Sequence, residues 1–391
     1  DFDDLLLNVL EIFKKFPEVQ EKYSRQFEYI LVDEYQDTNP PQYSLIEFLS
    51  KTHKNLCVVG DVDQAIYGFR CADFRNILLF EKDWPEGKVF VLEENYRSTS
   101  VILNAANAVI LQNKERKEKN LFTKKQGGEP IELFRANSGE KEAEFIALKT
   151  KELLDSGIEP DKITVLFRTN FQSRLLEEKF LAGNLPYQVI GVRFYERKEI
   201  KDILAYLRAS LNSGDFLSLG RIINNPPRGI GRVLQAKYLG GDKLNSGEKE
   251  KIKDLENLMR GIKNKIKKEV VSKAIDFVLA KTKYLELFDS SSEEGIMRIG
   301  NVKELLNLSE RFDKLQPPSG ILALLEEASL MSEQDSYENK SKVSLMTIHS
   351  AKGLEFDYVF IAGLEEGLFP HILSRVSDNE ASLEEERRLM Y

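Results

Sequence analysis

The chain has 391 residues, which is too long for one ordinary hydrophobic core, so we expect two or three domains. Hydrophobic residues make up 42% and charged residues 31%, and no stretch approaches the roughly 20 apolar residues that a membrane-spanning helix needs. The net charge of -8 neither indicates nor excludes nucleic-acid binding, because phosphate contacts depend on local patches. The two cysteines, Cys57 and Cys71, argue against a disulfide framework or a zinc site and favour a reducing cytoplasm.

The first half of the sequence alternates short apolar runs with amphipathic stretches. The predicted strands are 27–33, 55–61, 88–94, 130–136, 163–169 and 187–191. Strands that are apolar on both faces, with helical patterns between them, are typical of parallel sheets. The first half therefore predicts an α/β architecture.

The pattern changes at Asn212. From there to about Lys342 the sequence shows almost only helical periodicity, with polar punctuation between the helical stretches. Two further strands are predicted at 343–349 and 357–364. The sequence therefore predicts an α/β unit that is interrupted by an all-helical insertion.

Two adjacent carboxylates follow the first predicted strand. The apolar residues 30–32 lead directly into Asp33 and Glu34. In nucleotide hydrolases an Asp at such a position holds Mg²⁺, usually through water, and the next acid orients and deprotonates the attacking water. The alternative is that the two acids cap the following helix, which is predicted to begin near Pro40 and Pro41. The dipeptide alone leaves both interpretations open.

The longer string DEYQDTNPPQ (33–42) resembles motif II of superfamily 1A helicases, the UvrD/PcrA/Rep family. Other strings resemble further motifs of that family: VVGDVDQAIYGFRCAD (58–73, motif III), LEENYRS (92–98, motif IV), VLFRTNFQSR (165–174, motif IVa), TIHSAKGLEFDYVFIAGLEEGLFPH (347–371, motif V and its continuation) and EEERRLMY (384–391, the approach to motif VI). They occur in the family's order and span nearly the whole chain, so a chance match is negligible.

The resemblance implies a P-loop NTPase fold, with parallel RecA-like sheets and an all-helical insertion domain. Residues 1–112 would form the C-terminal part of the first RecA-like domain. Residues 113–212 together with 342–391 would form the second RecA-like domain, truncated before motif VI. Residues 213–341 would form the helical insertion, which carries a GIG hairpin.

The resemblance also implies ATP and Mg²⁺ as cofactors and assigns three residues to catalysis. Glu34 would be the catalytic base, Gln64 the amide that senses the γ-phosphate, and Arg97 an arginine finger. An Arg suits that task because its charge is permanent and its fork matches phosphate oxygens, although an ordinary surface Arg is the alternative. The other implied nucleotide contacts are Asp33 as the Mg²⁺ ligand, Tyr96 packed on adenine, Glu355 near the sugar, and Lys352.

An aromatic pair lies in the motif III string. Tyr67 and Phe69 are two residues apart, with Arg70 next to them, and two aromatics at this spacing are more often core residues. The resemblance instead implies stacking on single-stranded DNA, which is worth about 1–3 kcal/mol per base. The sequence departs from the family in having Phe69 where Trp is common and Cys71 where Gly is common. Other implied DNA contacts are Asn170, Thr347, His349 and His371.

The string GIG (229–231) lies in the helical insertion between Arg228 and Arg232, and it resembles a helix-hairpin-helix turn. Glycines let backbone N–H groups approach a phosphate closely, and flanking Arg residues add charge. The alternative is a plain helix–helix turn, which GxG alone does not exclude. Its position matches the family's duplex-contacting element, so we expect DNA contact from Arg228, Gly229 and Gly231.

The sequence contains no phosphate-binding string G-x-x-x-x-G-K-[ST]. The family carries that loop before the segment matching DFDDLL, and it continues beyond Tyr391 into motif VI. We therefore expect a piece of a longer helicase, with very poor ATP hydrolysis by this piece alone. For the parent protein we expect 3′→5′ movement on single-stranded DNA and duplex unwinding.

The expected partners are single-stranded DNA, single/double-strand junctions and repair or replication proteins, with no membrane and a monomeric or weakly dimeric state. Two alternatives stay open: a nucleic-acid-binding or regulatory module that kept the helicase scaffold but lost its motor, and the helicase part of a helicase–nuclease. The presence of Asp33, Glu34, Gln64 and Arg97 favours a motor over the first alternative. A nuclease domain beyond Tyr391 would be the sign of the second.

Overall fold

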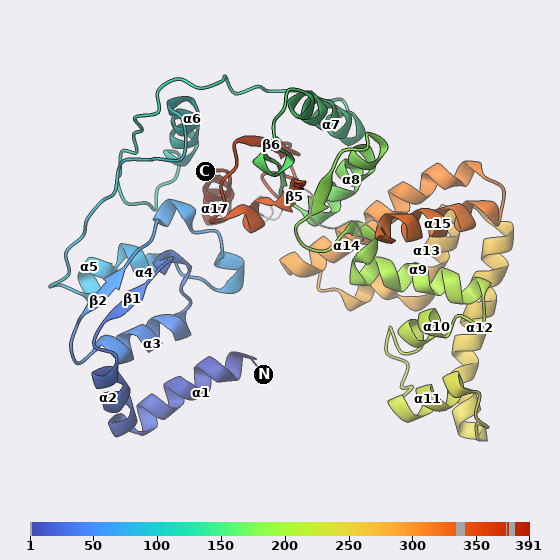
Figure 1. Cartoon of the computed structure of the whole chain (residues 1–391). Coiled ribbons are helices and arrows are strands. Elements are labelled where there is room, and N and C mark those ends of the chain that lie inside the picture. Colours follow the sequence, from blue (N-terminus) through green and yellow to red (C-terminus); the bar gives the residue numbers. More distant parts are fainter. Residues whose placement is uncertain (1, 334–340, 373, 375–379) are drawn as a thin grey trace. The chain divides into compact units, whose positions relative to one another are not determined.

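The computed structural model describes the whole chain except residues 1, 334–340, 373 and 375–379. Its contacts divide the chain into two compact units (Figure 1). Unit 1 comprises Asp1–Arg135, Ala351–Glu355 and Gly363–Tyr391, and unit 2 comprises Ala136–Ser350 and Phe356–Ala362. The predicted insertion, 213–341, falls within unit 2, and its residues 334–340 lie outside the described residues.

Unit 1 contains a two-stranded parallel sheet. Strand β1 (Ile30–Val32) pairs with β2 (Leu56–Val58), and each ends in a loop that contains a short 3₁₀ turn. The helices of unit 1 are α1 (Phe2–Lys15), α2 (Pro17–Gln26), α3 (Pro40–Ser50), α4 (Arg75–Leu78), α5 (Phe80–Asp83), α6 (Ser100–Ile110) and α17 (Glu380–Met390). The predicted strands 27–33 and 55–61 are each confirmed over three residues, Ile30–Val32 and Leu56–Val58.

Helix α3 begins at Pro40, as predicted, and its own N-cap is complete. The Asn39 side chain accepts from the N–H of Gln42 at 3.0 Å, and the Gln42 side chain accepts from the N–H of Asn39 at 3.0 Å. This is a capping box with Pro at the first helical position. Asp33 and Glu34 therefore do not cap α3, so the structural alternative for the carboxylate pair is excluded.

Two predicted strands, 88–94 and 130–136, are wrong: neither forms a strand in the structure. Both segments have strand-like composition, but among the described residues the first is linked only by a bridge from Glu94 to Phe122. Phe90 is 80% exposed and Leu133 is 85% exposed. A strand needs a partner as well as suitable residues, and composition does not supply the partner.

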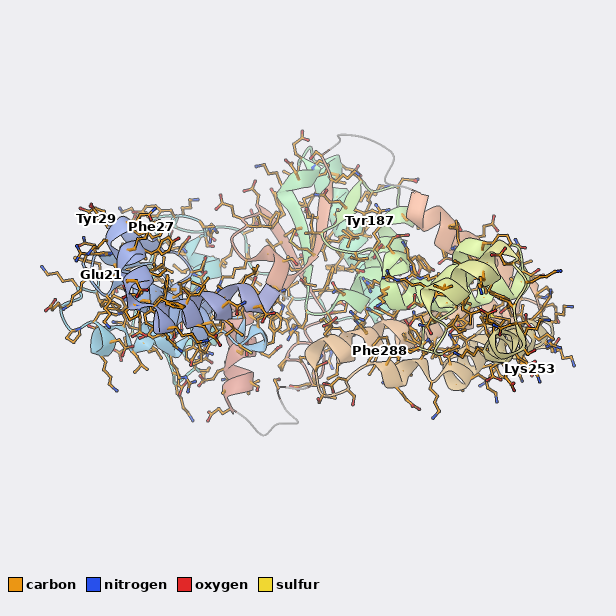
Figure 2. The ribbon with its side chains drawn as sticks, turned by 90° about the horizontal axis from the view of Figure 1, so that it is seen from below. Glu21, Phe27, Tyr29, Tyr187, Lys253 and Phe288 are labelled. Carbon is orange, nitrogen blue, oxygen red and sulfur yellow. The ribbon has the colours of Figure 1, made fainter. Side chains whose placement is uncertain are left out.

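Unit 2 contains a four-stranded parallel sheet in the order β4 (Tyr187–Val189), β5 (Val343–Thr347), β3 (Ile163–Phe167) and β6 (Tyr358–Ala362). The remaining predicted strands are thus confirmed. Helices α7 (Gly139–Asp155) and α8 (Ser173–Ala182) pack on it. Tyr187, labelled in Figure 2, meets Phe180 of α8 edge-on at 5.9 Å between ring centroids.

An all-helical segment lies between β4 and β5. Its helices are α9 (Lys198–Leu211), α10 (Phe216–Ile222), α11 (Arg232–Gly240), α12 (Ser246–Lys268), α13 (Val271–Thr282), α14 (Glu293–Ser309) and α15 (Ser319–Glu333). Helices α9, α10, α12, α13, α14 and α15 share a core that includes Ile203, Ile262 and Ile275. Helix α11 packs in a separate, smaller cluster through Leu234, next to Ile252 of α12. The predicted fold class, α/β with parallel sheets and a helical insertion, is confirmed. Over the residues that the structure describes, no helix has the length and apolarity to cross a membrane.

Candidate functional site

Asp33 and Glu34 leave the carboxyl end of β1 with exposed side chains. Glu34 has φ 51° and ψ 44°, a left-handed backbone that costs a residue other than glycine about 1–3 kcal/mol. Its N–H donates to Asp33 Oδ1 at 2.9 Å, which links the two residues. Such a backbone persists only where neighbouring contacts enforce it, and it turns the chain sharply at the carboxylate pair.

Gln36 supplies one of those contacts. Its side chain is fully buried, and its Nε2 donates to Glu34 Oε2 at 2.5 Å. Its Oε1 accepts from the N–H of Asp61 at 2.9 Å, so one amide joins the loop after β1 to the loop after β2. A Cβ on Gly60 would lie 2.5 Å from the same oxygen, which explains a glycine there. No role for Gln36 was predicted from the sequence, where its one distinguishing feature is its place two residues after Glu34.

Lys352 joins the same cluster. Its Nζ donates to Asp37 Oδ2 and, at 2.9 Å, to the backbone oxygen of Gln64, and it lies 3.4 Å from Glu34 Oε2. The ammonium group also lies 5.3 Å from the ring centroid of Tyr67. Burial raises the pKa of the Asp37 carboxyl, and the Lys352 charge acts in the opposite direction. Lys352 thus connects a carboxylate of motif II to the motif III aromatic.

The turn that carries Gln64 is held by buried charges. Gln64 Nε2 donates to Asp61 Oδ2 at 2.8 Å, and its side chain is exposed. Lys119 pairs with Asp61 and lies 3.1 Å from Asp63, a residue 1% exposed that also binds Arg116 at 2.8 Å. Burial alone would lower the pKa of Lys119, but the two Asp residues raise it. The amide of Gln64 therefore extends from a turn that is held in place by these ion pairs.

Arg97 and Glu355, predicted from different motifs, meet in unit 1. Arg97 Nε lies 3.0 Å from Glu355 Oε2, and both side chains are exposed. The Asn95 side chain accepts from the N–H of Arg97 at 3.1 Å, which shapes the turn before α6, whose N-cap is Thr99. Tyr96 is 73% exposed. The guanidinium and the aromatic face are accessible to a ligand.

Tyr67, Phe69 and Arg70 form a cluster in which Tyr67 is half-buried and the other two side chains are exposed. The two rings lie 6.0 Å apart at 53°, and the Arg70 guanidinium lies 5.4 and 5.3 Å from their centroids. Phe69 is 47% exposed. The interpretation of this pair as core residues is therefore wrong for Phe69, and a flat apolar surface next to a cation is available to a base.

Asn170, Thr347 and His349 belong to unit 2, where β3 and β5 end side by side. Phe167 is the register partner of Thr347, so the residues that follow both strands lie at one edge of the sheet. Thr347 Oγ1 lies 2.9 Å from Ser350 Oγ. All three predicted DNA contacts are partly exposed at this edge.

His371 lies in unit 1 and is buried, with 6% of its surface exposed. Its N–H donates to Glu386 Oε2 at 3.0 Å, and its carbonyl accepts from the hydroxyl of Ser374 at 2.6 Å. The structure does not group its side chain with the exposed aromatic cluster. A DNA contact from His371 stays a prediction.

The GIG hairpin is a preformed turn. Gly229 has φ 69°, which a side chain would strain, and no atom lies within 4 Å of where a Cβ would stand on Gly231. Ile230 is fully buried and packs with Ile223 and Leu234. The turn therefore presents its glycines outward and is anchored by Ile230.

The two arginines of the hairpin differ in their surroundings. Arg228 Nη1 donates to the carbonyls of Ile222 at 2.7 Å and Pro226 at 3.1 Å, and its guanidinium lies 5.7 Å from the Tyr206 ring centroid. Arg232 is exposed at the start of α11. The guanidinium of Arg228 thus holds the hairpin backbone, and that of Arg232 faces solvent.

Within the described residues no group of three or more His, Cys, Asp or Glu side chains could hold a metal ion. Mg²⁺ keeps several waters and uses one or two carboxylates together with substrate phosphates. The exposed carboxylate of Asp33 fits such a site, with its other ligands coming from water and phosphate oxygens.

Two family models cover nearly the whole chain. The model of the UvrD/REP helicase N-terminal domain matches residues 1–85, and that of the UvrD-like helicase C-terminal domain matches residues 90–391. The chain belongs to the UvrD/REP helicase family. The resemblance inferred from the motif strings is therefore confirmed.

Curated relatives of this UvrD/REP helicase chain carry the name ATP-dependent DNA helicase PcrA. The protein of Staphylococcus epidermidis strain RP62A is 43% identical over 412 aligned residues, and that of Staphylococcus aureus strain Mu50 is 42% identical. Both alignments cover 100% of this chain and 56% of the relative. The chain thus spans about half the length of the curated relatives it matches.

Proposed function

We propose that this chain is part of an ATP-dependent DNA helicase that moves 3′→5′ on single-stranded DNA and unwinds duplex DNA. The observation that carries the proposal is the position of Lys352 among Glu34, Gln64 and Tyr67. It connects a carboxylate suited to activating water with an exposed aromatic surface suited to a DNA base. The names of the relatives agree with such coupling.

In the nucleotide reaction, the exposed carboxylate of Glu34 accepts the proton of the attacking water, and Gln36 fixes the direction of that carboxylate. The Gln64 amide orients water near the γ-phosphate without adding charge. Arg97 leaves Glu355 to stabilise phosphate charge in the transition state. Asp33 would hold Mg²⁺ through water, and the ion would then neutralise charge on the phosphates.

Tyr67 and Phe69 stack on bases of single-stranded DNA. Each stacking contact contributes about 1–3 kcal/mol to binding, whatever the base. Arg70 adds a positive charge beside the rings. In unit 2, Asn170 and Thr347 at the edge of the sheet also contact single-stranded DNA. The backbone of the GIG hairpin binds a phosphate of the duplex at a junction.

The test is ATP hydrolysis by the full reading frame that encodes this chain, with and without single-stranded DNA. We expect stimulation by DNA and a loss of at least about 100-fold in the Glu34→Gln variant, because the base and not the binding surface is removed. DNA affinity should stay unchanged in that variant, and Glu18→Gln, on the exposed face of α2, is the matched control. Hydrolysis that survives Glu34→Gln would favour a regulatory module on a helicase scaffold.

A further inference from the structure

Helix α17 carries three consecutive glutamates, Glu384, Glu385 and Glu386, and each accepts a backbone N–H from a different segment of unit 1. Glu384 Oε1 accepts from Lys114 at 2.8 Å, Glu385 Oε1 from Gly68 at 2.9 Å, and Glu386 Oε2 from His371 at 3.0 Å. Bonds from backbone N–H groups to carboxylates are stronger than bonds between neutral groups. One helix thus fixes three loops that are far apart in the sequence.

The middle contact involves the aromatic cluster, because Gly68 lies between Tyr67 and Phe69. A Cβ on Gly68 would lie 2.9 Å from both Glu385 carboxylate oxygens. Gly68 does not have a positive φ, so the effect of an alanine there would come from its Cβ displacing the Glu385 carboxylate, the movable end of a side chain, and not from backbone strain. The Glu385 contact and the glycine therefore depend on one another.

Helix α17 has contacts with unit 1 other than that of Glu385. Glu384 is 4% exposed and Glu386 is 7% exposed, so both neighbouring contacts are buried. The guanidinium of Arg388 lies 4.2 Å from the Phe74 ring centroid and donates to the carbonyl of Glu115 at 3.2 Å. Loss of the Glu385 carboxylate should release the aromatic loop and leave α17 docked.

We propose that Glu385 is a positioning residue that holds residues 67–70 in the geometry that stacks on a DNA base. The DNA part of this inference rests on the proposed function, whereas the contact between Glu385 and Gly68 does not. The role of Glu385 is to keep the peptide between the two rings fixed, so that Tyr67 and Phe69 meet a base without first being ordered.

The test uses the 391-residue chain in three variants, with Glu380→Ala, an exposed position of the same helix, as control. In Glu385→Ala and Gly68→Ala, hydrogen exchange at residue 68 should become faster and the dissociation constant for single-stranded DNA should rise about tenfold. Stacking is followed by the fluorescence of 2-aminopurine in the strand. Glu385→Gln should restore both signals, because its amide oxygen can still accept from Gly68.

A double variant, Gly68→Ala with Glu385→Ala, should bind no more weakly than either single variant, because both remove one contact. Faster exchange at residue 68 with unchanged DNA affinity and unchanged 2-aminopurine fluorescence would overturn the positioning role. If the unaltered chain fails to bind single-stranded DNA, the proposed function fails. The contact between Glu385 and Gly68 is tested separately, with no DNA present. It would be overturned if hydrogen exchange at residue 68 were equally slow in Glu385→Ala and in the unaltered chain.

Discussion

Gln36 links the carboxylate of Glu34 to the loop after β2 through two hydrogen bonds. Its amide is the group best suited to this, since it donates to Glu34 and accepts from Asp61 at the same time. The strained backbone of Glu34 is stabilised by the same bond. A catalytic carboxylate is thus positioned by a residue that never needs to touch the nucleotide.

We predict that Gln36→Leu destabilises unit 1 by about 1–3 kcal/mol, because the N–H of Asp61 loses its acceptor and the carboxylate of Glu34 loses one of its hydrogen bonds. The chain has one tryptophan, Trp84, which lies in unit 1, so its fluorescence during urea unfolding reports on this unit. Gln112→Leu, at an exposed position, is the control. Equal unfolding midpoints for the two variants would contradict the role of Gln36.

We predict a pH-dependent effect for Lys352→Met. The folded pKa of Asp37 is raised by burial, and removing the opposing charge of Lys352 raises it further. A carboxyl with a raised folded pKa favours the folded state below its unfolded pKa, and this stability is lost as pH rises through the folded pKa. The free energy of unfolding of Lys352→Met should therefore be about 1–3 kcal/mol below that of the unaltered chain at pH 7, and this difference should shrink as pH falls towards 4.

Thermal unfolding followed by Trp84 fluorescence at several pH values measures this difference. Lys117→Met is the matched control, because Lys117 pairs with Glu81 at the surface, where an ion pair contributes little. A deficit of the same size at pH 4 and pH 7 would show that Lys352 acts through packing and not through the charge of Asp37.

The strands and helices that were predicted correctly are those whose packing partners lie among the described residues. Strands β3 and β5 were predicted because both are apolar and both find neighbours in the same sheet. The segments 88–94 and 130–136 have similar composition but no partner strand among the described residues, so the prediction failed there. Helix α3 was predicted from Pro40, because its start depends on local chemistry alone.

The candidate site shows the same limit. Motif strings identified Glu34, Gln64 and Arg97, because family resemblance is carried by residues close together in sequence. They did not identify Gln36 or Glu385, whose roles depend on contacts with distant segments. Tertiary packing decides those contacts, and a single sequence does not display it.

The two arginines of the GIG hairpin, which precedes α11, should affect DNA binding differently. Arg232→Ala should weaken junction binding and lower its salt dependence by about one phosphate contact, because its side chain faces solvent. Arg228→Ala should weaken binding with the salt dependence unchanged, because its guanidinium holds the carbonyls of Ile222 and Pro226. Junction affinity measured over a series of salt concentrations distinguishes the two, and each variant is the control for the other. Equal slopes would contradict the assignment.

At the scale of the whole molecule, the two units divide the proposed contacts unequally. All the residues proposed to contact nucleotide, from Asp33 to Glu355, fall in unit 1, and the GIG hairpin falls in unit 2. Unit 1 is discontinuous, since the chain returns to it at Ala351–Glu355 and again at Gly363–Tyr391. Those returning segments supply Lys352 and α17, so unit 1 includes residues that follow most of unit 2 in the sequence.

The phosphate-binding string is absent from these 391 residues, and this has a direct consequence for activity. We predict that the chain alone hydrolyses ATP at least about 100-fold more slowly than the full reading frame, because backbone and lysine donors to the phosphates are missing. Phosphate release measured with and without single-stranded DNA tests this, and DNA binding by the same preparation shows that the chain is folded. Clear DNA-stimulated hydrolysis by the isolated chain, lost in Glu34→Gln, would mean that the described residues hold the phosphates without that loop.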